Sequence, residues 1–210
     1  MKRTAYIILT KVPAPGFVKT RLTPIVTAST AAKIQQAMLQ NLLKQSAQVR
    51  QHIDIFLAYQ GQTAAVTRSF LQRLPQWVHV FPQISGSLGE KMSAAIANCQ
   101  QLGYQHVILS GSDIPQLSAS IMRQADQALV TTPTVLGPTL DGGYYLFGAR
   151  QINVAPFLAA DISWSSASVL ATTQQLLAEA QQAVTLLPKL QDVDFAADWV
   201  ELAPLLEEKP

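Results

Sequence analysis

The chain has 210 residues, of which 49% are hydrophobic and 13% are charged, with a formal net charge of +2. This composition predicts a folded domain, excludes a disordered chain and gives no reason to expect a nucleic-acid partner. Cys99 is the single cysteine, which excludes a disulfide framework and a cysteine-based metal site. The apolar run near the N-terminus stops at Leu9, too short for an export signal, and no apolar stretch approaches the length of a membrane span. We therefore expect one cytoplasmic domain over residues 1–210.

Short apolar runs rich in β-branched residues alternate with segments of helical periodicity through the first 130 residues. The predicted strands cover residues 5–9, 53–59, 78–81 and 107–109. The predicted helices cover residues 29–49, 63–74, 88–102 and 118–130. This order is typical of a three-layer α/β/α fold with a mostly parallel sheet.

The pattern changes after residue 130. Residues 135–138 and 144–148 flank an Asp-Gly-Gly turn, which predicts a strand-turn-strand unit. The remaining predicted elements are a helix at 165–182 that begins at one of the serines after Trp164, a strand at 184–187 and a helix at 195–206. The glutamine-rich helices are interpreted as solvated faces, Trp164 as a packing residue, and His52, His79 and His106 as structural.

Asp113 follows the fourth predicted strand, which is short, apolar and typical of a strand buried on both faces. Ligands of open α/β sheets bind at the carboxyl ends of such strands, so Asp113 is a candidate functional residue. The competing interpretation is that Asp113 caps the helix that begins near Ser118 or forms a turn.

A basic loop follows the first predicted strand, with Lys11, Lys19 and Arg21 close to Gly16. Cations at this edge of a sheet can hold phosphates, and arginine can do so through two parallel hydrogen bonds. A solvated surface loop is the alternative, and the sequence leaves both open.

Gly89 and Glu90 lie in a glycine-bearing turn before the third predicted helix. The spacing is not that of a P-loop, but the backbone N–H groups of a helix start can still bind an anion. Glu90 could equally be a first-turn acid that interacts with the helix dipole.

Three further acids need consideration. Asp141 lies in the predicted hairpin turn, which explains it without a ligand, although a second role remains open. Asp192 and Asp194 precede the last predicted helix and could hold Mg²⁺ near a phosphate. The alternative for Asp194 is a helix N-cap.

Six motifs, in this order, carry a family resemblance. They are Lys11-x-Pro13-x-Pro15-Gly16-x-x-Lys19-Thr20-Arg21-Leu22, Gly86-x-Leu88-Gly89-Glu90-x-Met92, Gly111-x-Asp113-x-Pro115-x-Leu117, Gly137-Pro138-x-x-Asp141-Gly142-Gly143-Tyr144, Ile162-x-Trp164-Ser165 and Asp192-Val193-Asp194. Together they resemble the glycosyltransferase-like family described as radical-SAM/selenodomain-associated transferases, within the nucleotide-diphospho-sugar transferase superfamily. Lys91, where the family often has arginine, and Phe195–Asp198, where it often has Thr-Pro-Glu-Asp, depart from the pattern.

The resemblance implies a GT-A-like fold and a metal-dependent transferase that uses a nucleotide sugar or a nucleoside triphosphate. By that resemblance the first loop holds the nucleotide phosphates through Lys11, Gly16, Lys19 and Arg21, and Gly89 and Glu90 join them as candidate nucleotide-binding residues. Asp113, with Asp194 or Asp192, is expected to hold Mg²⁺ or Mn²⁺. Asp113 and Asp141 are the candidate catalytic residues. A non-catalytic nucleotide-binding partner or regulator of a neighbouring enzyme is the alternative function.

Overall fold

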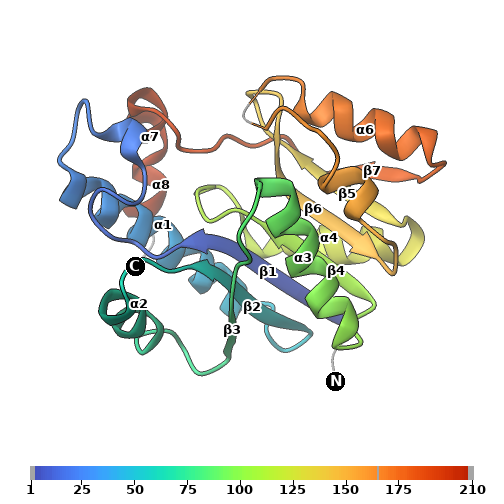
Figure 1. Cartoon of the computed structure of the whole chain (residues 1–210), viewed down its shortest axis with the longest axis horizontal. Helices are drawn as coiled ribbons and strands as arrows, with labels where there is room; N and C mark the ends of the chain where they lie inside the picture. The colour runs from blue at the N-terminus through green and yellow to red at the C-terminus, as the bar shows by residue number, and fades with distance from the viewer. Residues whose placement is uncertain (1–2, 165, 208–210) are drawn as a thin grey trace.

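A seven-stranded sheet forms the centre of the molecule in the computed structural model, which describes residues 3–164 and 166–207 (Figure 1). The strands are β1 (Thr4–Lys11), β2 (Ile53–Gln60), β3 (Val78–Pro82), β4 (His106–Ser110), β5 (Thr134–Pro138), β6 (Tyr144–Arg150) and β7 (Val184–Leu186). Their order is β3-β2-β1-β4-β6-β5-β7. Only β6 runs antiparallel to its neighbours, β4 and β5. The mostly parallel sheet and the β5–β6 hairpin predicted from the sequence are confirmed.

Helices cover both faces of this sheet. They are η1 (Thr20–Leu22), α1 (Ala28–Ala47), α2 (Ala64–Leu71), α3 (Leu88–Gln101), α4 (Ala119–Thr131), α5 (Ala155–Leu158), α6 (Val169–Glu179), α7 (Ala196–Leu202) and α8 (Pro204–Glu207). Side chains of β1 alternate between the two cores: Tyr6 and Ile8 pack with α1 and α4, while Ala5 and Ile7 pack with α3, α5 and α6. A strand buried on both faces gives the continuous apolar run seen in the sequence. The three-layer architecture is confirmed.

A third, smaller core lies at one end of the sheet. It contains Leu22 of η1, Met38 of α1, Val193 of the segment after β7, and Leu202 of α7. This core fixes the loop after β1 and the segment after β7 against the same helix. In Figure 1 that segment, drawn in red, crosses from β7 to the blue N-terminal third of the chain.

Three predictions of helices need correction. The helix expected at 165–182 covers Val169–Glu179 instead. The carbonyl of Gly142 in the hairpin turn accepts the backbone N–H of Leu170, and this contact fixes the first turn of the helix. Ser165 lies outside the described residues. The helix expected at 195–206 is divided into α7 and α8, and Pro204, which has no backbone N–H, begins α8. Buried Gln35 and Gln45 show that α1 is not merely a solvated glutamine-rich face.

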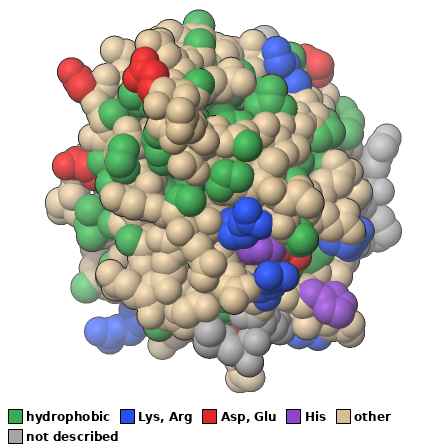
Figure 2. Space-filling model, turned by 90° about the vertical axis from the view of Figure 1, so that its right-hand side faces the viewer, with side chains coloured by type: hydrophobic (Ala, Val, Ile, Leu, Met, Phe, Trp, Pro, Cys, Tyr) green, Lys and Arg blue, Asp and Glu red, His purple; other side chains and the backbone are tan. Residues whose placement is uncertain are grey.

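The surface has a mixed character on the side of α6 and β7 (Figure 2). Hydrophobic side chains are distributed among polar ones on this face, and the described residues visible there form no broad field of one charge sign. Within residues 3–164 and 166–207, no helix is long and apolar enough to cross a membrane.

Candidate functional site

A cleft of about 1080 Å³ opens at the carboxyl ends of the parallel strands. Its walls come from the loop after β1, the loop after β4, the β5–β6 turn and the segment after β7. Parallel strands point their carboxyl ends to one edge, so the topology alone brings these four distant segments together. The volume is slightly above the usual range of about 300–1,000 Å³ for small-molecule sites.

The loop after β1 is a folded segment and not a loosely solvated one. Val12 continues the β1–β2 pairing by donating its N–H to the carbonyl of Gln60, and Val12, Val18 and Leu22 are buried. Lys19 has a φ of 47° and ψ of 40° and precedes η1. This left-handed turn, rare for a residue with a side chain, sends the chain from the cleft into η1. The loop is therefore anchored in the core by these buried side chains, while Lys11, Gly16 and Arg21 on it are exposed.

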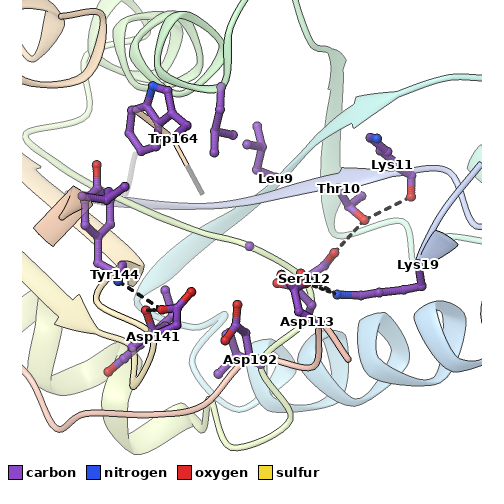
Figure 3. Close-up of a pocket in the computed structure, with 18 of the residues that line it drawn as sticks. Leu9, Thr10, Lys11, Lys19, Ser112, Asp113, Asp141, Tyr144, Trp164 and Asp192 are labelled. Atoms are coloured by element: carbon purple, nitrogen blue, oxygen red, sulfur yellow. Dashed lines mark hydrogen bonds and ion pairs between the residues drawn. The ribbon is translucent and has the colours of Figure 1, made fainter. Parts of the chain in front are cut away.

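Lys19 lines the cleft and extends its ammonium to Asp113 (Figure 3). Its ammonium donates to Asp113 Oδ2 at 2.8 Å and to the carbonyl of Val193 at 2.5 Å, and lies 3.3 Å from Asp194 Oδ1. The side chain is only 8% exposed. Burial opposes its charge, but the carboxylates of Asp113 and Asp194 outweigh this effect and raise the pKa of Lys19. One ammonium thus joins the loops after β1, β4 and β7.

The other two predicted cations of the basic loop also line the cleft. Arg21 donates to Asp194 Oδ2 at 2.9 Å, and its guanidinium lies 5.5 Å from the centre of the Phe195 ring. Lys11 lies over the ring of Phe17 at 5.6 Å. Both cations rest on aromatic faces, which orients them, and Arg21 is in addition paired with a carboxylate.

Asp113 is held by a buried hydrogen-bond network. The hydroxyl of Ser112 donates to Thr10 Oγ1 at 2.8 Å and accepts from the amide of Gln35 at 2.7 Å. The carbonyl of Asp113 accepts the N–H of Val193 at 3.0 Å. Sequence reasoning missed Gln35, although its place on the apolar stripe of α1 was a usable signal.

The alternative roles of two acids as helix caps are wrong. Ser118 caps α4 by accepting the N–H of Ile121, so Asp113 is not the cap. Asp198 accepts the N–H groups of Asp194 and Phe195 at the start of α7, at 3.0 and 2.6 Å. The carboxylates of Asp113 and Asp194 are therefore turned to Lys19 and the cleft.

Asp141 and Asp192 extend the acidic side of the cleft. Asp141 accepts from the hydroxyl of Thr139 and from the N–H of Gly143 at 3.1 Å, as expected of a turn residue. Burial, and next the charges of Asp141, Asp194 and Asp113, raise the pKa of Asp192 to about 6. Figure 3 shows Asp192 between Asp141 and Asp113, and all three line the cleft.

Oxygen atoms suited to a hard cation converge at one point. Asp113, Asp194 and the carbonyl of Val193 each direct an oxygen at the Lys19 ammonium. Among the described residues no three His, Cys, Asp or Glu side chains form a metal-holding group. Two carboxylates nevertheless fit Mg²⁺, which usually takes one or two carboxylates and completes its shell with water and substrate phosphates.

Three of the predicted nucleotide-binding residues do not line the cleft: Gly16, Gly89 and Glu90. Glu90 forms a capping box with Ser87, whose N–H donates to Oε2 at 2.7 Å, and this hydrogen bond lowers the pKa of Glu90. Gly89 permits close packing, because a Cβ there would meet the carbonyl of Leu158. The structure thus gives each of these two residues a local structural role.

An aromatic wall, which the sequence analysis did not assign to the site, closes the opposite side of the cleft. The rings of Tyr144 and Trp164 meet edge to face at a centroid distance of 6.1 Å and face the interior of the cleft (Figure 3). Trp164 also packs on Gly89. The prediction that Trp164 packs is confirmed, and its packing forms part of the site wall. His106, bonded to Asp126 at 2.8 Å, lies outside the cleft.

Comparison with protein families gives one match. The model described as "Uncharacterized protein conserved in bacteria (DUF2064)" matches residues 42–166. A comparison with curated proteins finds no match.

Comparison with solved structures gives similar proteins over nearly the whole chain. A candidate nucleotide-diphospho-sugar transferase from Desulfovibrio desulfuricans G20 is 28% identical, with a TM-score of 0.86 over 99% of this chain and 98% of that one. CMP:2-keto-3-deoxy-manno-octonic acid synthetase complexed with CTP is 10% identical, with a TM-score of 0.63 over 99% of both chains. Rv0371c from Mycobacterium tuberculosis H37Rv, complexed with manganese, is 18% identical, with a TM-score of 0.54 over 99% of this chain and 100% of that one. These likenesses confirm the fold expected from the motifs.

Proposed function

This chain belongs to the DUF2064 family, and we propose that it is a transferase that uses a nucleotide sugar or a nucleoside triphosphate together with Mg²⁺ or Mn²⁺. The observation that carries the proposal is the meeting of the basic loop and the acidic segments at one sheet edge, with Lys19 bonded to Asp113. Nucleotide phosphates need cations, and the metal that accompanies them needs carboxylates. The cleft supplies both.

The basic loop is the part of the cleft that suits the phosphates. Arg21 and Lys11 line it, and Arg21 can offer a guanidinium group to phosphate oxygens. Fixed cations in a cleft stabilise the charge that develops on a departing phosphate, because they need no reorientation during the reaction. Gly16 is a second position of positive φ in this loop, at 73°, besides Lys19.

Asp113 and Asp194 would hold the divalent cation, with Asp192 beside them. When bound, such a cation neutralises phosphate charge and orients the leaving group. The network of Ser112 and Gln35 fixes the loop that carries Asp113, so the carboxylate is positioned before any ligand arrives. Asp141 lies on the side of Asp192 opposite to Asp113. We propose it as a second catalytic acid, on the side of the acceptor.

Similar proteins support the two finer parts of this proposal. The fold is shared with a protein complexed with CTP and with one complexed with manganese. The six motifs of the sequence resemble the radical-SAM/selenodomain-associated transferases, and we propose that subtype and a cytoplasmic location.

A thermal-shift panel tests the proposal. Nucleoside triphosphates and nucleotide sugars are added with Mn²⁺ or with EDTA, and a ligand that binds the folded state raises the melting temperature. We expect at least one nucleotide to stabilise the protein more with Mn²⁺. Release of a nucleoside diphosphate or of pyrophosphate from that ligand then distinguishes glycosyl from nucleotidyl transfer. A panel without any shift would contradict nucleotide use.

A further inference from the structure

We propose that the Lys19 ammonium is the resident cation of the Asp113–Asp194 pair and that a divalent ion binds only by displacing it. The inference rests on the proposed function, because it takes Asp113 and Asp194 as the metal-binding carboxylates. It adds a residue that controls metal entry, which the motif resemblance does not supply. The divalent ion and the Lys19 ammonium thus occupy the same place between Asp113 and Asp194, and only one of them can be there at a time.

The contacts of Lys19 leave no separate place for a second cation between these carboxylates. The three oxygens around Nζ come from Asp113, Asp194 and the Val193 backbone, at 2.5 to 3.3 Å. Mg²⁺ requires its oxygens at about 2.0–2.1 Å and in octahedral directions. A metal ion on the same oxygens would lie against the ammonium, and two cations at such a distance repel strongly inside a cleft. Metal binding therefore requires Lys19 to leave.

The chain around Lys19 allows it to leave without a change of fold. Lys19 stands in a left-handed conformation just before η1, while the neighbouring Val18 and Leu22 hold the loop in the core. The long side chain can turn about its own bonds within the cleft, which also contains Lys11 and Arg21. A released ammonium joins these two cations and becomes available to phosphate. The exchange would couple metal arrival to the completion of the phosphate site.

The burial of Lys19 explains why the exchange matters in the absence of nucleotide. The side chain is 8% exposed, whereas Asp113 and Asp194 are 33% and 34% exposed. The ammonium compensates two carboxylates that would otherwise repel each other. Lys19 thus weakens the binding of divalent ions until a phosphate offers its ammonium a second partner.

Manganese binding to the nucleotide-free protein tests the inference. Free Mn²⁺ is measured by electron paramagnetic resonance for the wild type, Lys19→Met and Lys19→Met/Asp113→Asn. We expect Lys19→Met to bind Mn²⁺ about tenfold or more tightly than the wild type, the equivalent of a charge-assisted hydrogen bond. The double variant should lose this gain. Equal affinity of Lys19→Met and wild type would overturn the inference.

Lys91→Met is the matched control, because Lys91 also lines the cleft and its change removes the same charge. It should bind Mn²⁺ as the wild type does. A gain as large in Lys91→Met as in Lys19→Met would show a general effect of charge and would also overturn the exchange.

A measurement on the wild-type protein covers the case in which Lys19→Met does not fold. Lysine acetylation is followed by mass spectrometry with saturating Mn²⁺ and with EDTA. We expect Mn²⁺ to accelerate acetylation of Lys19 about tenfold, since the ammonium loses its charge-assisted hydrogen bonds. Lys91 should react at the same rate in both conditions. An unchanged rate at Lys19 would overturn the exchange.

The outcomes separate this inference from the proposed function. If the protein binds nucleotide with Mn²⁺, but Lys19 neither reacts faster nor limits Mn²⁺ affinity, the exchange is wrong and the proposed function stands. A protein whose Lys19→Met variant gains Mn²⁺ affinity, but which binds no nucleotide, has the exchange and not the proposed function.

Discussion

Arg21 and Asp194 form an ion pair at 2.9 Å although 173 positions separate them in the sequence. The pair ties the loop after β1 to the segment after β7 at the mouth of the cleft. Arg21 is 53% exposed, and exposed ion pairs contribute only about 0–1 kcal/mol to stability. The main effect of the pair is therefore to position the Arg21 guanidinium beside the proposed phosphate site, and its contribution to stability is small.

Arg21→Ala should weaken nucleotide binding and leave folding almost unchanged. Loss of a charge-assisted hydrogen bond to phosphate corresponds to about 1.5–3 kcal/mol. Calorimetric titration with the nucleotide that gives the largest thermal shift measures the effect. Arg123→Ala, which removes an exposed arginine from α4, is the control and should bind normally. Unaltered affinity of Arg21→Ala would contradict a phosphate role for the loop.

Asp113→Asn should abolish the Mn²⁺-dependent part of nucleotide binding. The substitution keeps the size of the side chain but removes the charge that attracts the cation. It also takes one carboxylate from Lys19, so we expect a loss of about 1–3 kcal/mol in the free energy of unfolding. Nucleotide affinity is measured with Mn²⁺ and with EDTA.

The exposed Asp161 provides the control for Asp113, as Asp161→Asn removes the same charge away from the cleft. Its Mn²⁺ enhancement should match that of the wild type. An equal enhancement in Asp113→Asn would remove Asp113 from the metal site.

Local sequence patterns were sufficient to predict most of the fold. Each strand of the parallel half is a short apolar run, and the alternation of strand and helix leaves few topologies. The β5–β6 hairpin was predicted from the turn formed by Asp141 and the two glycines after it. The start of α6 could not be predicted, because it depends on a carbonyl of Gly142, which is distant along the chain. Ends of helices that are fixed by tertiary contacts leave little local signal.

The sequence was sufficient to predict which types of residue form the candidate site, but not which of them contact one another. The loops that carry Lys19 and Asp113 were identified from their positions after strands. No local pattern shows that one ammonium contacts acids 94 and 175 positions away. Gln35 was missed for a different reason: it was interpreted with the other glutamines as solvated, although it lies on the apolar stripe of α1.

Stability should depend on pH through Asp192. Its pKa of about 6 in the folded protein exceeds the ordinary value of about 3.9, so the folded state holds this proton more tightly than the unfolded state. Stability conferred by the protonated form is present below about pH 4 and is lost as the pH rises through 6. Above pH 6 the free energy of unfolding of Asp192→Asn should therefore exceed that of the wild type by about 1–2 kcal/mol, allowing for the partial exposure of Asp192.

Urea unfolding in EDTA across pH 4 to 7 measures this difference, because subtracting the wild-type from the Asp192→Asn free energy cancels the other titrating groups. Asp161→Asn should show no such trend, since Asp161 is exposed and outside the cleft. A difference that stays flat from pH 4 to 7 would mean that burial and the neighbouring carboxylates do not raise the pKa of Asp192 as described.

Gly89→Ala should destabilise the protein, although the same change at an ordinary helical glycine stabilises by about 0.5–1 kcal/mol. The added Cβ would strike the carbonyl of Leu158 and come within 2.9 Å of Trp164 Cζ2, so α3 must move from α5 and from the aromatic wall. Overpacking of this kind costs about 1–3 kcal/mol. Gly16→Ala is the control: no atom lies within 4 Å of its added Cβ, and only the φ of 73° opposes it, by about 1–2 kcal/mol. Chemical denaturation of both variants measures these losses. A stabilised Gly89→Ala protein would show that α3 and Trp164 do not pack as closely as the structure has them.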